Sequence, residues 1–302
     1  MKQEVLVVAP IPPELRERLS SKYTLIDAKP EAGSVFSGMP IAVTTSMAGA
    51  DEALMASLPD LKLIACNGTG LDKIDQEAAR ARGITVRNTP DVVTEDTADC
   101  AIGLMYAVVR RIAEADRFVR SGKWKSARMQ PSRRLYSKHL GVVGMGRIGQ
   151  AIAKRASGIG MKVSYTGPNA KDGVPHEYVA DIAALAQAVD ILVLSCPATP
   201  QTRHLVNRVV LEALGSQGYL INVSRGSVVD EAALIEALEA GTIAGAGLDV
   251  FENEPDIDPR FAALENTVLQ PHVAAVTTET RHAMADILET AIDRYFETAR
   301  PK

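Results

Sequence analysis

The stretch LGVVGMGRIG, residues 140–149, decides how the chain folds. Its glycines Gly144, Gly146 and Gly149 have the spacing G-x-G-x-x-G, with an apolar run before them and apolar residues at helical spacing after them. This pattern predicts a strand, a tight turn and a helix, with a second strand at residues 161–165. Glycine lets the backbone turn tightly, and the helix N-terminus offers free N–H groups and positive potential to a pyrophosphate. We therefore predict a dinucleotide site here rather than an ordinary glycine-rich turn.

Strand and helix patterns alternate along the rest of the chain. Before the glycine stretch, strands are expected at 4–9, 41–44, 61–65 and 84–86, with helices at 14–21, 51–57 and 75–82 between them. From the glycine stretch onward, strands are expected at 140–143, 161–165, 190–194, 218–223, 245–249 and 267–270. This alternation predicts an α/β chain with parallel sheets that are covered by helices on both faces.

Two long helical segments flank the second set of strands. The first is predicted as one helix over residues 95–121, capped by Thr94, ended by Gly122 and long enough to bridge two domains. A less regular segment at residues 123–138, here called the arm, follows it and contains the only tryptophan, Trp124. The second is an amphipathic helix over residues 278–298.

Composition limits the classes of function. The 302 residues are 46% hydrophobic and 23% charged, with a formal net charge of −4, which is typical of a globular protein and gives no general attraction to nucleic acid or membrane. We find neither a signal peptide nor an apolar run of membrane-spanning length. The scattered cysteines Cys66, Cys100 and Cys196 fit a reducing, cytoplasmic compartment, and no histidine pair has the spacing of a metal site, so no metal is expected.

One window of the chain is strongly basic. No aspartate or glutamate occurs from Arg117 through Lys171, although lysine and arginine are frequent there. Two interpretations stand side by side: a solvated basic face, placed at a subunit contact, or a positive field around a polyanionic cofactor.

Polar residues follow three of the predicted strands. Arg225 lies in the run Asn222–Gly226, Asp249 and Glu254 lie in the run at residues 247–255, and His272 lies in the run at residues 270–274. In a parallel sheet these strand ends share one edge with the glycine turn, and ligands bind at that edge in open α/β folds.

Such a set suits a nicotinamide enzyme that reduces a 2-keto acid. A guanidinium grips a carboxylate and polarises the keto oxygen, an imidazole supplies the proton, and a carboxylate beside the imidazole favours its charged form. Each residue taken singly also has a structural interpretation, which for His272 is the better one: a histidine of the core. The structural alternatives are a surface ion pair for Arg225, a loop cap for Asp249 and part of a turn for Glu254. Their common place at strand ends favours the catalytic interpretation for His272, Arg225 and Glu254.

Together these runs resemble the D-2-hydroxyacid dehydrogenase family, and in particular its glyoxylate/hydroxypyruvate reductase branch. The resemblance covers nearly the whole chain, through NGTGLDKID at residues 67–75, residues 140–149, 222–230 and 247–255, and Pro271-His272. It implies a Rossmann cofactor domain, residues 96–280, inserted in a flavodoxin-like substrate domain, residues 1–95 and 281–302. Each domain would hold a doubly wound parallel sheet.

The resemblance also implies roles for individual residues. Arg225, Glu254 and His272 form the catalytic set, Asp249 meets the nicotinamide amide, and the N–H groups of Thr69 and Gly70 hold the substrate carboxylate. The expected substrate-binding residues are Met47, Gly68, Thr69, Gly70, Arg225 and His272. The expected cofactor-binding residues are Thr97, Gly144, Gly146, Arg147, Ile148, Gly149, Thr166, Asn169, Lys171, Cys196, Pro197, Val223, Ser224 and Asp249.

The chain departs from the family pattern at several positions. Ala274 and Ala275 replace a common Gly-Ser pair after the histidine, Ser137 replaces a glycine, and Ser132-Arg133-Arg134 replace leucine-rich loop residues. These changes leave the substrate preference and the contacts of the arm open, but not the reaction class.

The loop after the second strand of the cofactor domain bears on cofactor choice. NAD enzymes usually place a carboxylate there to bind the ribose hydroxyls. Here the strand runs into Thr166-Gly167-Pro168-Asn169-Ala170-Lys171, and no carboxylate occurs before Asp172. A 2′-phosphate is thus not repelled, and Asn169 and Lys171 are able to donate to it, although Pro168 stands where the branch often has arginine. We predict NADP(H) as the preferred cofactor, with NAD(H) possible.

The predicted activity is NAD(P)H-dependent reduction of a short 2-keto acid, of the glyoxylate or hydroxypyruvate type, to the D-2-hydroxy acid. The family implies a homodimer, with the arm as the candidate cross-subunit element. The alternatives are a nucleotide-sensing, corepressor-like interaction protein and a formate- or phosphite-type dehydrogenase. The first is disfavoured because the chain begins and ends close to the fold, and the second by the basic window and the missing carboxylate.

Overall fold

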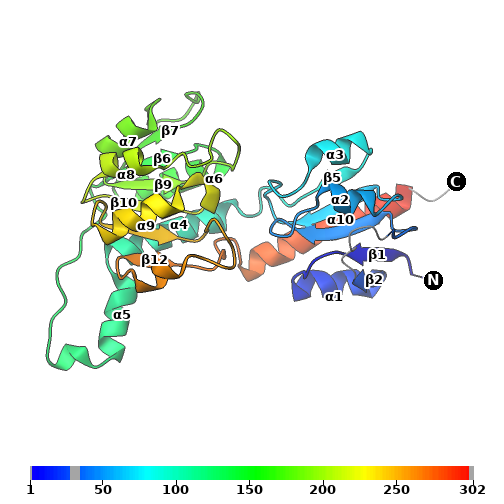
Figure 1. Cartoon of the computed structure of the whole chain (residues 1–302), viewed down its shortest axis with the longest axis horizontal. Helices are drawn as coiled ribbons and strands as arrows, with labels where there is room; N and C mark the ends of the chain where they lie inside the picture. Colours follow the sequence, from blue (N-terminus) through cyan, green and yellow to red (C-terminus); the bar gives the residue numbers. More distant parts are fainter. Residues whose placement is uncertain (1, 28–34, 299–302) are drawn as a thin grey trace. The chain divides into compact units, whose positions relative to one another are not determined.

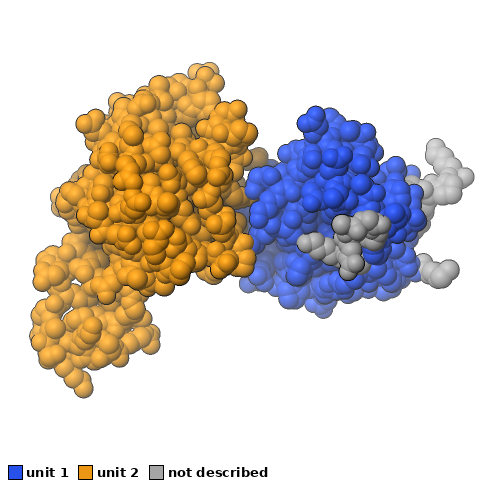
Figure 2. Space-filling model, in the orientation of Figure 1, with its two compact units in different colours: residues 1–93, 276–302 blue, residues 94–275 orange. Residues whose placement is uncertain are grey.

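The computed structural model describes residues 2–27 and 35–298, and the chain divides into two compact units (Figures 1 and 2). Unit 1 consists of Met1–Val93 and Val276–Lys302, and unit 2 of Thr94–Ala275. The expected division lay at 95/96 and 280/281; its ends at residues 1 and 299–302 lie outside the described residues.

Unit 1 is built on a five-stranded parallel sheet. Its strand order is β2-β1-β3-β4-β5, which is the flavodoxin-like order expected for this domain. The strands are β1 (Glu4–Val7), β2 (Thr24–Asp27), β3 (Ile41–Thr45), β4 (Leu63–Asn67) and β5 (Thr85–Arg87).

Helices cover both faces of this sheet (Figure 1). Side chains alternate along a strand, so Val5 and Val7 of β1 pack with α1 (Pro13–Lys22) and α10 (Thr278–Thr298), the helix predicted at those residues. Leu6 faces the other way, with α2 (Glu52–Ala56) and α3 (Gln76–Ala81).

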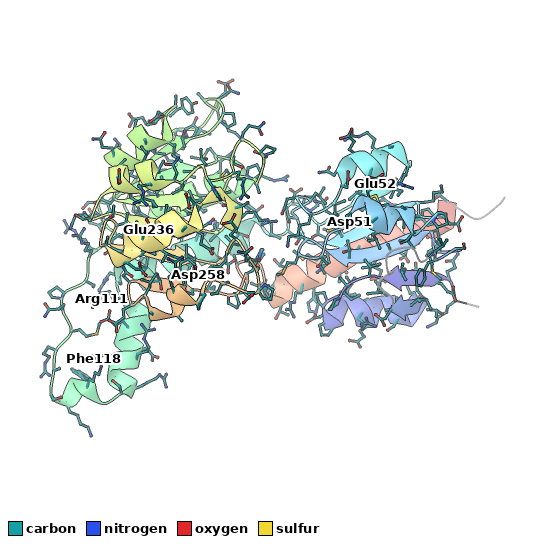
Figure 3. The ribbon with its side chains drawn as sticks, viewed as in Figure 1. Asp51, Glu52, Arg111, Phe118, Glu236 and Asp258 are labelled. Carbon is teal, nitrogen blue, oxygen red and sulfur yellow. The ribbon has the colours of Figure 1, made fainter. Side chains whose placement is uncertain are left out.

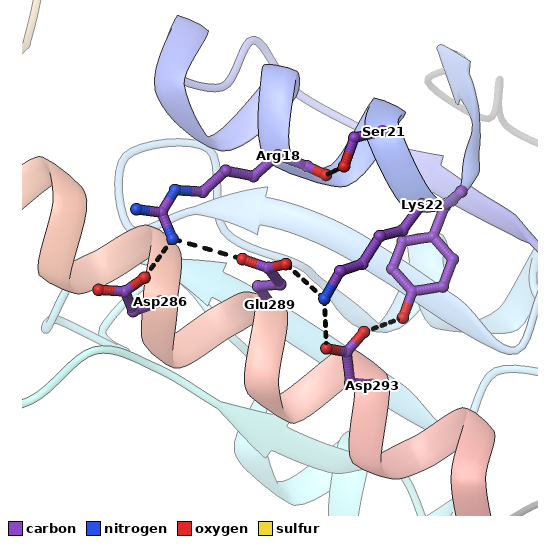
Figure 4. A network of polar contacts seen from close by, with 7 residues as sticks. Arg18, Ser21, Lys22, Asp286, Glu289 and Asp293 are labelled. Carbon is purple, nitrogen blue, oxygen red and sulfur yellow. Dashed lines mark hydrogen bonds and ion pairs between the residues drawn. The ribbon is translucent and has the colours of Figure 1, made fainter.

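Charged side chains join α1 to α10 at the edge of this core (Figure 4). Lys22 Nζ lies 2.5 Å from a Glu289 oxygen and 2.7 Å from an Asp293 oxygen. Arg18 pairs with Asp286, and the Tyr23 hydroxyl donates to Asp293. The C-terminal helix is thus fixed to the N-terminal βα unit, which explains how the two chain ends form one unit.

Unit 2 is built on a seven-stranded parallel sheet with the order β12-β11-β10-β9-β6-β7-β8. β6, the strand before the glycine turn, lies inside it, and the order reverses there as in a Rossmann fold. The strands are β6 (His139–Val143), β7 (Lys162–Thr166), β8 (Glu177–Tyr178), β9 (Ile191–Leu194), β10 (Tyr219–Asn222), β11 (Gly245–Leu248) and β12 (Thr267–Leu269).

Two helix layers enclose this sheet. α4 (Thr94–Val109) and α6 (Arg147–Gly158) cover one face, where Arg155 of α6 pairs with Glu95 and Asp99 of α4 at 2.7 and 2.6 Å. The other face is covered by α7 (Ile182–Ala188), α8 (Arg208–Leu214) and α9 (Glu231–Glu239).

The prediction of one helix over residues 95–121 was wrong. The segment forms α4 and a second helix, α5 (Ile112–Arg120), with Arg111 between them at φ 54° (Figure 3). The Arg111 guanidinium is held by both oxygens of Glu114 at 2.6 Å. The buried stripe of α4 ends at Val109, and α5 has no buried residue. The sequence does not indicate this break, because no glycine or proline lies between residues 104 and 121.

Two short strands, β2 and β8, were also not predicted. Within residues 2–27 and 35–298, no helix has the length and apolar character needed to cross a membrane.

Candidate active site

The glycine turn joins β6 to α6, and packing inside unit 2 requires two of its glycines. Gly144 has φ 94°, and a Cβ on it would lie 2.7 Å from the Cα of Cys196, which follows β9. A Cβ on Gly149 would lie 2.1 Å from the carbonyl oxygen of Gly144. Real side chains do not approach this closely, so the fold itself explains both glycines.

The middle glycine needs another explanation. A Cβ on Gly146 would meet nothing within 4 Å, and its φ of −74° suits any residue. Gly146 is the N-cap of the 12-residue helix α6, and no side chain caps the N–H groups of its first turn. Arg147 and Ile148 form its first turn. A dinucleotide pyrophosphate fits this open side of the turn.

The loop after β7 carries the residues expected at the ribose. Asn169 and Lys171 are exposed, and Asp172 is the first carboxylate after the strand. Thr166 is buried instead, and its hydroxyl donates to the carbonyl of Ala180 at 3.3 Å. Its own carbonyl accepts the N–H of Gly144 at 2.9 Å, which ties the end of β7 to the glycine turn.

Other expected cofactor residues lie in unit 2, and one of them, Cys196, packs against the turn. The Ser195 hydroxyl donates to the Gly144 carbonyl at 2.8 Å and fixes the chain before Cys196 and Pro197. Thr97 on α4, Cys196 and Val223 are buried. Burial raises the pKa of the Cys196 thiol to about 11, so it is a neutral packing group at neutral pH.

Arg225 follows β10 on a turn that Asn222 builds. The Asn222 side-chain oxygen accepts the N–H and the hydroxyl of Ser224 at 3.0 and 2.7 Å, and its amide donates to the Arg225 carbonyl at 3.0 Å. The Ser224 hydroxyl is therefore committed to the turn. A Cβ on Gly226 would lie 1.9 Å from the carbonyl carbon of Phe251, so this turn packs directly on the chain after β11.

Asp249 directly follows β11 and organises the histidine loop. Its two carboxylate oxygens accept the N–H groups of Val273 and Ala274 at 2.8 and 3.0 Å, and its carbonyl accepts the N–H of His272 at 2.8 Å. Only 1% of Asp249 is exposed, and burial raises the pKa of its carboxyl. Asp249 thus caps the loop, which is the structural role that the sequence suggested for this residue taken singly.

His272 and Glu254 form a pair at this edge of the sheet. The His272 Nδ1 lies 2.6 Å from a Glu254 oxygen, and the other Glu254 oxygen accepts the N–H of Phe251 at 2.8 Å. Burial raises the pKa of the Glu254 carboxyl, but the hydrogen bonds from His272 and Phe251 and the charges of His272 and Arg225 outweigh it and hold the pKa below its usual value. Glu254 is therefore an ionised partner for the imidazole.

The expected substrate loop lies in unit 1. Gly68 has φ 140°, and a Cβ on it would lie 2.3 Å from the Ser46 hydroxyl. The Thr69 hydroxyl donates to the Thr89 carbonyl at 2.9 Å. Among the described residues, no group accepts the N–H of Thr69 or Gly70, so the turn presents two successive donors. Met47, also expected there, is 45% exposed.

The structure therefore brings Arg225, Asp249, Glu254 and His272 together within unit 2 and places Met47, Gly68, Thr69 and Gly70 in unit 1. Two residues that shape the site were not predicted. Asn222 had a recognisable signal, since Asn-x-Ser favours a turn closed by the asparagine side chain. Gly226 had none, because the chain that it meets lies some 25 residues further on.

Known proteins match the chain over most of its length. Residues 102–274 match the family described as D-isomer specific 2-hydroxyacid dehydrogenase, NAD binding domain. Glyoxylate/hydroxypyruvate reductase A of Arabidopsis thaliana is 44% identical over 298 residues, which cover 97% of this chain and 95% of the relative. The 2-ketogluconate reductase of Gluconobacter oxydans is 42% identical over 297 residues, 98% of this chain and 96% of the relative.

A solved structure agrees with these matches. The NADPH-dependent glyoxylate/hydroxypyruvate reductase of Sinorhizobium meliloti, in complex with NADP and malonate, has a TM-score of 0.93 and 38% identity, covering 99% of this chain and 95% of that one.

Proposed function

The chain belongs to the family of D-isomer-specific 2-hydroxyacid dehydrogenases, and on that premise we propose that it reduces a short 2-keto acid to the D-2-hydroxy acid with NADPH. The two relatives reported above are named for glyoxylate and hydroxypyruvate and for 2-ketogluconate, and on these two we base the proposed substrate class, the polar 2-keto acids. These names favour an enzyme over a corepressor-like protein, and a keto-acid reductase over a formate or phosphite dehydrogenase.

The observation that carries the proposal is the bond from His272 Nδ1 to Glu254 at 2.6 Å. With Nδ1 bonded to a carboxylate, Nε2 is the ring nitrogen left to transfer a proton to the keto oxygen. Glu254 orients the ring and stabilises the imidazolium that precedes transfer. His272 is the general acid in reduction and the general base in the reverse direction.

The other site residues bind and polarise the substrate. We assign Arg225 to the substrate carboxylate and keto oxygen, because its planar guanidinium reaches two oxygens at once. Within unit 1, the N–H donors of Thr69 and Gly70 suit a substrate carboxylate, and we propose Met47 and Gly68 as further substrate-binding residues. Asp249 holds the loop of His272, and a bond from it to the cofactor amide stays part of the proposal.

The cofactor is the source of the transferred hydride when bound, and the protein supplies position and charge. The open face of Gly146 and the uncapped start of α6 suit its pyrophosphate. The absence of a carboxylate before Asp172 suits a 2′-phosphate, with Asn169 and Lys171 as its proposed partners. The relative solved with NADP is named as NADPH-dependent, which supports this choice.

A substrate panel tests the function. The purified protein is assayed with glyoxylate, hydroxypyruvate and 2-ketogluconate, each with NADPH and NADH, and we expect turnover with a higher kcat/KM for NADPH. His272→Ala should lose at least about 100-fold in kcat, the usual contribution of a general acid, while NADP⁺ binding persists. Unchanged turnover in that variant would remove His272 from its role, and a preference for NADH would overturn the cofactor choice.

The assembly and compartment are also proposals. We propose a homodimer in which α5 and the arm contact the second copy, because Ile112, Val119 and Trp124 are 51%, 54% and 60% exposed. Figure 2 shows α5 and the arm protruding from unit 2. A cytoplasmic location is proposed from the cysteines, since Cys66, Cys100 and Cys196 are free thiols.

A further inference from the structure

The loop at residues 167–171, between β7 and β8, is exposed but held at both ends. At its start, the Tyr178 hydroxyl donates to the Gly167 carbonyl at 3.0 Å. At its end, the Lys171 N–H donates to the Tyr165 hydroxyl oxygen at 2.8 Å. Between these bonds lie Pro168, Asn169 and Ala170, all exposed. Two phenol groups thus fix the ends of a five-residue loop.

The two tyrosines form one unit. Tyr165 and Tyr178 are register partners on β7 and β8, with ring centroids 5.4 Å apart at 55°. Only 2% of Tyr165 is exposed, and its carbonyl accepts the N–H of Val179 at 2.8 Å. The bond from Tyr165 therefore starts in the core of unit 2, and Tyr178 lies beside that ring on the edge strand β8.

The hydroxyl groups are not needed for packing alone. A phenylalanine fills the ring position in a core and brings no polar atom that needs a partner. A tyrosine in the core is useful where its hydroxyl reaches something specific, and among residues 2–27 and 35–298 the partner of each hydroxyl is the backbone of this loop. The pair thus serves the conformation of residues 167–171.

We propose that Tyr165 and Tyr178 are positioning residues for the 2′-phosphate of NADPH. Holding both ends of the loop removes conformational freedom that would otherwise be lost on binding, so the donors of Asn169 and Lys171 are in place before the phosphate arrives. NADH has no 2′-phosphate, so the tyrosines discriminate between the two cofactors without contacting either. This inference rests on the proposed NADP(H) preference of the same site.

Direct binding tests the inference without any keto acid. Tyr165→Phe, Tyr178→Phe and the double variant of the full chain are titrated calorimetrically with NADP⁺ and NAD⁺, and with 2′,5′-ADP and 5′-AMP. Each single variant should raise the Kd for NADP⁺ and 2′,5′-ADP about fivefold, the effect of one hydrogen bond, and leave the Kd for NAD⁺ and 5′-AMP unchanged. Tyr136→Phe is the matched control, because Tyr136 is a 66% exposed tyrosine of unit 2.

Three results would overturn the inference: an unchanged Kd for NADP⁺ in the double variant, an equal rise for both cofactors, or no binding of NADP⁺ by the wild type. Because these binding measurements need no turnover, they distinguish a failure of this inference from a failure of the proposed reaction. A protein that binds NADP⁺ selectively but reduces no keto acid would contradict the proposed function and leave the role of the tyrosines supported.

Discussion

At the scale of single residues, the conformation of His272 depends on acceptors supplied by the chain after β11. The residue has φ 56°, in the left-handed region that a histidine rarely adopts. The backbone and side chain of Asp249 accept the N–H groups of three successive residues, 272–274, and hold this conformation. Glu254 then fixes the orientation of the ring. Asp249 thus determines the backbone conformation at His272, and Glu254 determines the orientation of its imidazole.

Glu254→Gln tests this division of work. The amide keeps the size of the side chain but loses the charge that stabilises the imidazolium, so kcat for keto-acid reduction should fall roughly 100-fold. Because the folded pKa of Glu254 lies below its usual value, its contribution to stability is present at neutral pH and is lost as the pH falls through the folded value. The free energy of unfolding in urea is measured for wild type and Glu254→Gln at pH 7 and pH 4. The difference between the two proteins should be larger at pH 7 than at pH 4.

The opposite trend, with the stability difference growing toward acid, would contradict an ionised Glu254. Asp230→Asn is a suitable control, because Asp230 caps α9 in the same unit and has no place in the site.

The sequence predicted which residues meet at this edge of the sheet better than it predicted the residues that support them. Arg225, Glu254 and His272 were predicted because strand ends in a parallel sheet share an edge, and residue type then limits the chemistry. Gly226 was missed because the residue must be glycine only to leave room for the backbone of Phe251. No local sequence pattern reveals that distant contact. Ser137 illustrates the same limit: its φ of 63° explains why the family usually has glycine there.

At the scale of elements, the fold requires Gly144 and Gly149 of the glycine turn but not Gly146, on whose open side we propose the pyrophosphate. Gly146→Ala should weaken NADP⁺ binding at least about tenfold, because a methyl group would occupy space that the pyrophosphate needs, while the melting temperature stays within about 2 °C of wild type. Calorimetric titration and thermal unfolding measure the two effects.

Substitutions of two further glycines serve as controls for this result. Gly158→Ala lies near the other end of α6 in open space and should leave NADP⁺ binding unchanged, with a stability gain of up to about 1 kcal/mol. Gly149→Ala should destabilise the unit by about 1–3 kcal/mol, because the Gly144 carbonyl must move. Normal NADP⁺ affinity in Gly146→Ala would exclude the pyrophosphate from this side of the turn.

Most elements were predictable, but β2, β8 and the break at Arg111 were not. Every other strand of the two sheets and the final helix at residues 278–298 were found, because burial imposes a period on most of them. The break at Arg111 was not found, since the residues on both sides of it continue a helical pattern and only the tertiary surroundings change.

At the scale of the whole molecule, the unburied helix α5 argues for a second copy of the chain. Figures 1 and 3 show α5, with Phe118, projecting from the body of unit 2. A cavity of about 340 Å³ lies beside its start, lined by residues from α4, α5 and the amino ends of β10 and β12, including Arg111, Glu114, Arg117, Tyr219 and Glu265. An isolated helix of nine residues is marginal in water, so α5 needs packing that unit 2 does not give it.

The double variant Ile112→Asp, Val119→Asp should therefore convert a dimer of the 32.3 kDa chain into a monomer, as measured by light scattering across a range of protein concentrations. Two charges on the apolar side of α5 oppose burial against a partner but cost little in a monomer, where both positions already face water. Val209→Asp is the control, because Val209 on α8 is 63% exposed and lies outside α5 and the arm. A wild-type protein that is monomeric at every concentration would refute the dimer, and a variant that stays dimeric would place the contact elsewhere.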